Sequence, residues 1–298
     1  MRTTKRFTPK VLERFVRQGR GTGTYGDYLP WHRVSRGDPS SLGRSHLLMW
    51  RNRLREFLSD GELVEHLFGT MLPNLDDALE QSKLDPDDTP HLLTAYGEGK
   101  PWELFPGTLK LAKKLGIKHP KISDGQDSVP WVPTSDLVLI FKAPQGTHEA
   151  LALAFKPRDW NKNRRTIELL GLEREYWSVR RVPWLLITPE LYDDRVALTL
   201  RRIAPWALSE PVSMKDMQVT ASVAREMVGH SMTSVLYRSA ELLGNLETAQ
   251  RALWQAVWYG KLPIDLRRGW RPQIPLKFIS DSEFRGLNPI SSRRSAWN

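Results

Sequence analysis

The segments TSDLVLIF (134–141) and EALALAFK (149–156) decide the fold that this sequence predicts. Both are runs of strand-forming apolar residues, and the short loop KAPQGTH (142–148), which holds a proline and a glycine, joins them. We therefore expect a β-hairpin. Its strands would lie about 4.8 Å apart, with opposed residues on one face. Because Asp136 and Lys156 both lie at the ends remote from the loop, the hairpin should bring their side chains together.

Helical and strand signals alternate outward from the hairpin. Residues 163–179 have the periodicity of a helix, and VPWLLIT (182–188) is typical of a buried strand that follows a crossover helix. Ahead of the hairpin, a helix is expected at 60–72, because Ser59 and Glu62 have the spacing of a capping box. This order of elements predicts an α/β fold.

The regions ahead of the hairpin carry weaker signals. Residues 1–20 are basic with apolar side chains at helical spacing, which predicts a short amphipathic helix. Residues 19–43 are rich in glycine and turn residues and predict no regular element. The stretch 76–101 is acidic and rich in Asp, Pro and Gly, so we interpret it as an inserted loop with a short helix.

The region after Ala204 is helical again and closes on the basic, proline-containing tail DLRRGWRPQIPLKFIS (265–280). Helices followed by a basic hairpin favour a winged helix. We therefore predict two domains, residues 1–203 and a smaller, mainly helical domain at 204–298.

The composition favours a polyanionic partner. Of 298 residues, 44 are Lys or Arg and 34 are Asp or Glu, which leaves a net charge of +10. Nucleic acid is the first interpretation, and a basic surface that keeps the chain in solution is the alternative. The absence of cysteine excludes disulfides and thiolate zinc sites and suits a reducing cytosol. No run approaches the roughly 20 apolar residues that span a bilayer, so we expect a cytoplasmic protein without a membrane partner.

The predicted convergence of Asp136 and Lys156 suggests a phosphodiester hydrolase. Glu62, at the start of the preceding helix, could supply a second carboxylate. Two carboxylates bind magnesium, which stabilises charge on a phosphate, while a lysine orients the attacking water. The alternatives are a surface ion pair for Asp136 and Lys156, and a purely structural capping role for Glu62.

Glu173 is a further candidate, because it falls in the middle of the apolar arc of helix 163–179. A buried carboxylate needs an arginine, a metal ion or a hydrogen-bond donor as its partner. Structural pairing with Arg165 or Arg44 is the alternative to a catalytic role.

Several motifs in this order resemble the TnsA family, the endonuclease subunit of heteromeric, Tn7-like bacterial transposases. The motifs are GRGTGTYGDYLPW (19–31), PSSLGRSH (39–46), LSDGEL (58–63), GIKHP (116–120), TSDLV (134–138), FKP (155–157), RTIELLGLEREYW (165–177) and PWLLIT (183–188). The resemblance implies a restriction-endonuclease-like PD-(D/E)xK catalytic domain followed by a winged-helix-like domain.

The resemblance also implies roles for individual residues. Glu62 and Asp136 stand at the metal-binding acids, Lys156 at the active-site lysine, and Glu173 at a glutamate of the following helix. The chain departs from the family at Ala154, where a Gln or Glu usually stands two residues before the lysine. We expect water, the carbonyl oxygen of Phe155 and Glu173 to complete the shell of a Mg²⁺ ion, for which Mn²⁺ can substitute.

The function implied by the resemblance is hydrolysis of the 5′, non-transferred strand at transposon ends. The implied partners are DNA, a TnsB-like DDE transposase and a TnsC-like ATPase regulator, with the protein associated with the bacterial nucleoid when it acts. We expect four arginines to hold DNA phosphates: Arg17, Arg20, Arg44 and Arg165. The alternatives are a catalytically impaired scaffold subunit that has lost activity at Ala154, and a stand-alone nuclease of the same fold.

Overall fold

A four-stranded sheet with the order β3-β6-β7-β8 forms the centre of the first of two units in the computed structural model, which describes residues 7–35 and 44–297. The first unit comprises Met1–His66, Asn74–Ile187 and Trp297, and the second comprises Leu67–Pro73, Thr188–Ala296 and Asn298. The described part of the chain is thus a mixed α/β protein.

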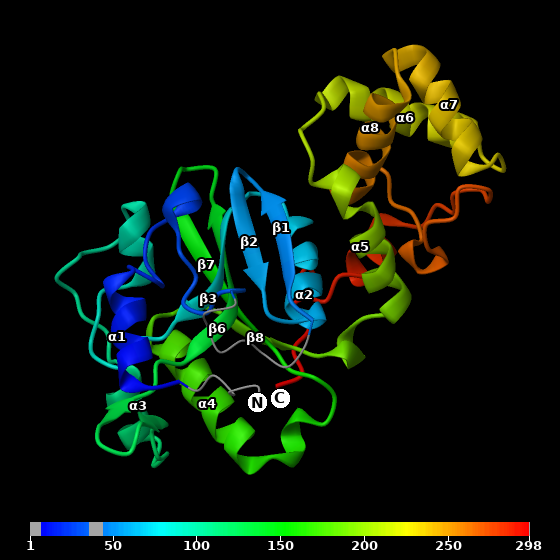
Figure 1. Ribbon diagram of the computed structural model, residues 1–298. Helices are drawn as coiled ribbons and strands as arrows, with labels where there is room; N and C mark the ends of the chain where they lie inside the picture. Colours follow the sequence, from blue (N-terminus) through cyan, green and yellow to red (C-terminus); the bar gives the residue numbers. More distant parts are fainter. Residues whose placement is uncertain (1–6, 36–43, 298) are drawn as a thin grey trace. The chain divides into compact units, whose positions relative to one another are not determined.

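The first unit contains all the strands of the described chain, and Figure 1 shows the four strands of the central sheet side by side. Its strands are β1 (His46–Trp50), β2 (Arg53–Phe57), β3 (Leu75–Lys83), β4 (Lys121–Ser123), β5 (Ser128–Pro130), β6 (Thr134–Lys142), β7 (His148–Phe155) and β8 (Trp184–Ile187). Its helices are α1 (Pro9–Arg17), η1 (Tyr25–Asp27), α2 (Asp60–Thr70, which continues into the second unit), η2 (Leu92–Tyr96), α3 (Thr108–Lys114), η3 (Trp160–Lys162) and α4 (Arg164–Val179).

The central hairpin forms as predicted. Strands β6 and β7 pair antiparallel with Leu137 opposite Leu153. Strand β8 joins β7 in the parallel sense, after helix α4 has crossed over. One face of the sheet packs on α3 and α4, through a core that contains Val138, Ala152 and Trp177.

The acidic stretch at 76–101 contains the predicted short helix, η2, but its first part is not a loop, because it belongs to β3, the strand that pairs with β6. Two acids of β3, Asp77 and Glu80, are buried against long-range partners. The guanidinium of Arg53 binds Glu80 with two hydrogen bonds, of 2.5 and 2.8 Å, and Arg55 lies 3.4 Å from Asp77. These arginines compensate the charges that made the segment resemble a solvated loop.

Two strands ahead of β3 were also absent from the sequence prediction. Strands β1 and β2 form a separate antiparallel hairpin whose turn residues, Arg51 and Asn52, have φ values of 48° and 60°. Two successive positive φ values are what a tight type I′ turn requires, and Asn-Gly is its usual sequence. The turn therefore lacked its common signature.

The second unit is mainly helical. Its elements are η4 (Pro189–Leu191), α5 (Asp194–Ala207), α6 (Met214–Glu226), α7 (Met232–Leu243), α8 (Leu246–Trp258), η5 (Leu266–Arg268) and α9 (Asp281–Gly286). The basic tail at 265–280 has no regular strand within the described residues, but it makes two isolated bridges, Ile264 with Phe278 and Ser231 with Pro275. The predicted domain boundary at 203/204 falls inside α5, whereas the division of the chain lies at 187/188.

Two further predictions concern the ends of the chain and the membrane. Residues 1–6 of the predicted basic helix, and residues 39–43 of the PSSLGRSH motif, lie outside the described residues. Among the helices that the structure describes, none is both long and apolar enough to cross a bilayer.

Candidate active site

Three of the residues predicted for catalysis meet in the first unit. Asp136 lies near the start of β6, Lys156 directly follows β7, and Glu62 lies in the first turn of α2. Glu62 is buried, and the side chains of Asp136 and Lys156 are 15% and 30% exposed. The site therefore lies at the end of the hairpin that is remote from its loop.

Asp136 is held by the strand that follows it in the chain. Its Oδ2 accepts a hydrogen bond from the main-chain N–H of Phe155 at 2.8 Å and one from Nζ of Lys156 at 3.2 Å. The same ammonium donates to the carbonyl oxygen of Phe155 at 2.7 Å. The hairpin thus places a carboxylate, a carbonyl oxygen and an amine within one cluster of contacts, as the register predicts.

Glu62 is fixed by the residues that begin α2. Its carboxylate accepts from the N–H of Leu58 at 3.0 Å and from the hydroxyl of Ser59 at 3.1 Å, and its own N–H donates to Ser59 Oγ at 3.2 Å. The predicted capping contacts are therefore present. Oε2, which accepts from the N–H of Leu58, also accepts a further bond from the sheet.

Gly61 allows the start of α2 to approach the hairpin. A Cβ at this position would lie 2.0 Å from Cε1 of the Phe155 ring, which is much closer than any real contact. The absence of a Cβ at Gly61 thus lets the start of α2 lie against the Phe155 ring.

Gln81 of β3 joins the two acids, and the sequence analysis did not identify it. Its Nε2 donates to Glu62 Oε2 at 3.1 Å and to Asp136 Oδ1 at 3.4 Å, while its Oε1 accepts from Thr134 at 2.9 Å. Gln81 also has a φ of 49° in the middle of a strand, in the left-handed region that non-glycine residues rarely occupy. Such strain persists where the surrounding contacts impose it, and it is common at functional sites.

Glu65 is a second residue that the sequence analysis missed. It follows Glu62 by one turn of α2, is fully buried, and has no hydrogen-bond partner for either carboxylate oxygen within the described residues. Burial, followed by the negative charges of Asp136 and Glu62, raises the pKa of Glu65 well above its usual value. The surroundings of Glu65, next to the site, therefore favour its protonated form.

Burial and mutual repulsion also shift the acids of the site itself. Burial, followed by the charge of Asp136, raises the pKa of Glu62 to about 7. For Lys156, burial disfavours the charged amine, but the negative charges of Asp136 and Glu173 outweigh it and raise the pKa. At neutral pH the site therefore holds a charged ammonium beside an acid that is close to its titration midpoint.

Glu173 lies on α4 and contacts the neighbour of Asp136. Its Oε1 accepts from the hydroxyl of Ser135 at 2.7 Å and from Nε1 of Trp184 at 3.1 Å. Burial raises its pKa to about 7. The expected inward position and hydrogen-bond donors are present, whereas Arg165 and Arg44, the structural partners considered as alternatives, bond elsewhere.

The oxygens of the site fit a hard divalent cation in chemical type. Glu62, Asp136 and the carbonyl of Phe155 offer oxygen ligands only, as Mg²⁺ prefers. These oxygens already accept hydrogen bonds from the side chains of Gln81 and Lys156. They therefore surround a region in which a positive charge is stabilised. Within the described chain, no group of three or more His, Asp or Glu side chains is arranged as a metal cluster. Ala154 is fully buried and contributes no ligand.

The four arginines predicted to bind DNA have different surroundings. Arg20 is 7% exposed, with its guanidinium 3.9 Å from the Phe15 ring centroid and bonded to Gln18, so it supports the α1 region. Arg17 is exposed at the end of α1. Arg44 pairs with Asp60, two residues from Glu62.

Arg165 is tied into the start of α4. It donates to the carbonyl of Lys118 at 2.6 Å and to Glu168 at 3.1 Å. The predicted role in DNA binding for Arg17, Arg20, Arg44 and Arg165 stays a prediction.

Comparison with known proteins gives one relative of clear similarity. No protein-family model matches the chain. Over 223 residues the chain is 29% identical to the Escherichia coli protein named Transposon Tn7 transposition protein TnsA, and this region covers 74% of the chain and 69% of the relative.

Proposed function

Because the chain is a TnsA-like protein, we propose that it is the endonuclease subunit of a transposase and hydrolyses the 5′, non-transferred strand at transposon ends. The observation that carries this proposal is the meeting of Asp136, Lys156 and Glu62 at one end of the central hairpin. Two carboxylates beside an amine are the groups that metal-assisted phosphodiester hydrolysis requires.

We assign the first unit to the PD-(D/E)xK nuclease fold and the second to the winged-helix class. The first assignment is supported by the order of elements, in which an acid-bearing helix precedes the Asp-and-Lys hairpin, a crossover helix and a parallel strand. The second is supported by three consecutive helices, α6 to α8, followed by the bridged basic tail.

Glu62, Asp136 and the Phe155 carbonyl would hold Mg²⁺, with Mn²⁺ as a substitute. The ion would supply charge stabilisation at the phosphate and a lower pKa for a bound water. Glu62 must lose its proton before it can bind a cation, and its pKa of about 7 predicts nicking that increases as the pH rises through 7.

Lys156 acts as a donor rather than as a base. Its raised pKa keeps the amine protonated, and an ammonium can donate hydrogen bonds but cannot accept a proton. It would orient the attacking water and offset the negative charge that develops on the phosphate. Glu173 supports this arrangement through Ser135, and it adds negative charge near the ammonium.

Gln81 compensates for the departure at Ala154. The side-chain amide that the resemblance places on β7 is missing here, and an amide from β3 contacts both acids instead. We assign Gln81 the role of holding the two carboxylates apart and correctly oriented. Arg17, Arg44 and Arg165 would bind DNA phosphates around this site.

The test is reconstitution with a TnsB-like DDE transposase and a TnsC-like ATPase on DNA that carries a labelled transposon end. We expect nicking of the 5′ strand that depends on a divalent ion and on the partners. Asp136→Ala should abolish it while assembly is retained, and Asp127→Ala, which changes an exposed acid of the same unit, should not.

Other results identify the alternative functions. Nicking by the wild-type chain without partners would indicate a stand-alone nuclease. A complex that needs the chain for assembly but does not cut the 5′ strand, either with the wild-type chain or with Asp136→Ala, would indicate a scaffold subunit. Ala154 would then be the structural reason for the lost activity. Undiminished cutting by Asp136→Ala would remove the assigned active site.

A further inference from the structure

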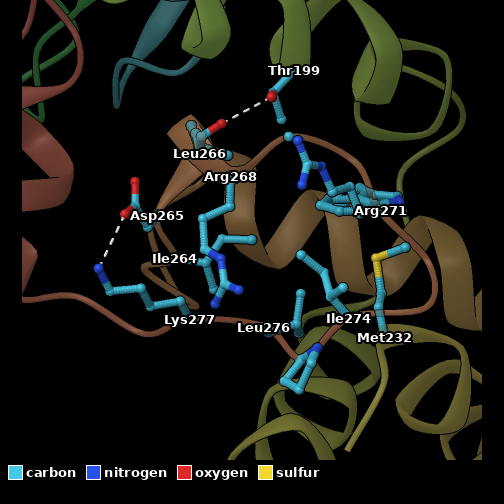
Figure 2. A pocket seen from close by; sticks show the side chains of 13 residues that line it. Thr199, Met232, Ile264, Asp265, Leu266, Arg268, Arg271, Ile274, Leu276 and Lys277 are labelled. Carbon is cyan, nitrogen blue, oxygen red and sulfur yellow. Dashed lines mark hydrogen bonds and ion pairs between the residues drawn. The ribbon is translucent and has the colours of Figure 1, made fainter. Parts of the chain in front are cut away.

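An open hollow of about 460 Å³ on the second unit is lined by charged side chains alone. The lining residues are Arg195, Asp265, Arg267, Arg268, Arg271 and Lys277. They come from the first turn of α5, from η5 and from the extended tail that follows it. Figure 2 shows the small pocket that adjoins the hollow and shares four of these residues, with Arg268 beside the pair formed by Asp265 and Lys277.

The hollow has an excess of positive charge. Five cations line it, and the acids that touch them are Asp193 on Arg195, Asp265 on Arg267 and Lys277, and Glu283 on Arg267. Within the described residues, the side chains of Arg268 and Arg271 make no hydrogen bond or ion pair, and both are exposed. Two guanidinium groups are therefore available to an anion.

Main-chain contacts, rather than these two arginines, hold the hollow in shape. Thr199 of α5 donates to the carbonyl of Leu266 at 2.8 Å, as Figure 2 shows, and the N–H of Asp265 donates to the carbonyl of Lys277 at 2.8 Å. The carboxylate of Asp265 also accepts from the N–H of Arg267 at 3.2 Å, which caps η5. Substitution of Arg268 or Arg271 should thus leave the unit folded.

The lining favours phosphates over an acidic protein segment. Four of the five cations are arginines, whose planar guanidinium groups bind phosphate oxygens in pairs. A protein partner would need apolar anchor residues to bury, and the hollow offers none, whereas contact with a nucleic-acid backbone needs only charge and donors.

We propose that this hollow binds backbone phosphates of duplex DNA, through Arg268 and Arg271 with Lys277 alongside. It is a DNA contact additional to the candidate active site. The choice of DNA as the polyanion rests on the proposed function, whereas the excess charge and the open lining do not.

The test measures DNA binding without cleavage. The full chain is titrated into a fluorescent 20-base-pair duplex in EDTA at several salt concentrations, and a gel checks that the duplex stays intact. We expect Arg268→Ala/Arg271→Ala to weaken binding by about tenfold or more at 0.1 M salt, and to lower the slope of log K against log salt by about 1.8, since each phosphate contact contributes about 0.9.

The matched control is Lys215→Ala/Arg238→Ala, which removes two exposed cations of the same unit outside the hollow. It should keep the wild-type slope, and melting curves should show that both double variants are folded. Equal binding by the two double variants overturns the proposal, as does tighter binding of polyglutamate than of duplex to the wild-type chain. Failure of the proposed function would instead appear as absent nicking with DNA binding intact.

Discussion

Replacing Gln81 by alanine should destabilise the first unit by about 3 kcal/mol in the absence of divalent cations. The variant loses the bonds to Glu62 at 3.1 Å, to Asp136 at 3.4 Å and from Thr134 at 2.9 Å. A neutral hydrogen bond contributes about 1 kcal/mol and one to a charged group about 1.5–3 kcal/mol, with the 3.4 Å contact the weakest. Alanine retains the strain of the positive φ, so nothing offsets the loss.

Gln81→Ala should also increase the extent to which divalent cations stabilise the folded protein. Without the amide between them, the charges of Glu62 and Asp136 repel more strongly, and the pKa of Glu62 should rise further above 7. If both acids bind a divalent cation as proposed, its positive charge would replace the hydrogen-bond donor that the variant lacks. Excess Mg²⁺ should therefore stabilise Gln81→Ala more than it stabilises the wild-type chain.

The assay is urea unfolding followed by tryptophan fluorescence, in EDTA and in excess Mg²⁺. Gln126→Ala, which truncates an exposed glutamine of the same unit, is the control and should unfold like the wild type. If Gln81→Ala and Gln126→Ala have the same stability in EDTA, or if Mg²⁺ affects all three proteins equally, the bridging role of Gln81 is refuted.

Three further predictions address the surroundings of the site. The pKa of Glu173 is about 7 in the folded chain and about 4.5 in the unfolded chain, so the stability that its protonated form contributes is complete below pH 4.5 and is lost as the pH rises through 7. Glu173→Gln should remove about 3 kcal/mol of this pH dependence, measured as the free energy of unfolding between pH 4.5 and 8, and an unchanged pH profile would contradict the prediction. Gly61→Ala should lower nicking at least tenfold with an unchanged circular dichroism spectrum, because its Cβ would meet the Phe155 ring; wild-type nicking would show that the close approach is unimportant. Gln81→Ala should lower nicking, because it loses the amide that contacts both acids, and adding Ala154→Gln should restore it by returning an amide to β7; a double variant no more active than Gln81→Ala argues against this compensation.

Local signals accounted for much of the fold. Helices 164–179 and 60–70 begin at a side-chain cap and end within two residues of the prediction, and the central hairpin forms around its loop. The resemblance to TnsA, recognised from ordered motifs, was confirmed by comparison. These features depend on residues that are neighbours in the chain, or on apolar side chains that recur every 2 residues in a strand or every 3.6 residues in a helix.

The interpretation of β3 failed because its charged residues have partners that are distant in the chain. Strand β3 looked like a solvated loop because the arginines that bury its acids lie 22 and 27 residues away. Burial of a charge was also not evident at Arg20, which packs on the Phe15 ring and donates to the carbonyl oxygen of Trp31 at 3.4 Å. Nothing in the local pattern distinguishes a buried ion pair from a solvated charge.

The sequence by itself determined the hairpin, its crossover helix and the meeting of Asp136 with Lys156, because strand pairing fixes which residues face each other over 20 positions. Only the tertiary structure decided that Gln81 lies between the two acids and that Glu65 is buried beside them, with no hydrogen-bond partner in the part of the chain that the structure describes. Those positions depend on how β3 and α2 pack against the hairpin, since the burial that raises the pKa values of the acids exists only once these separate segments assemble.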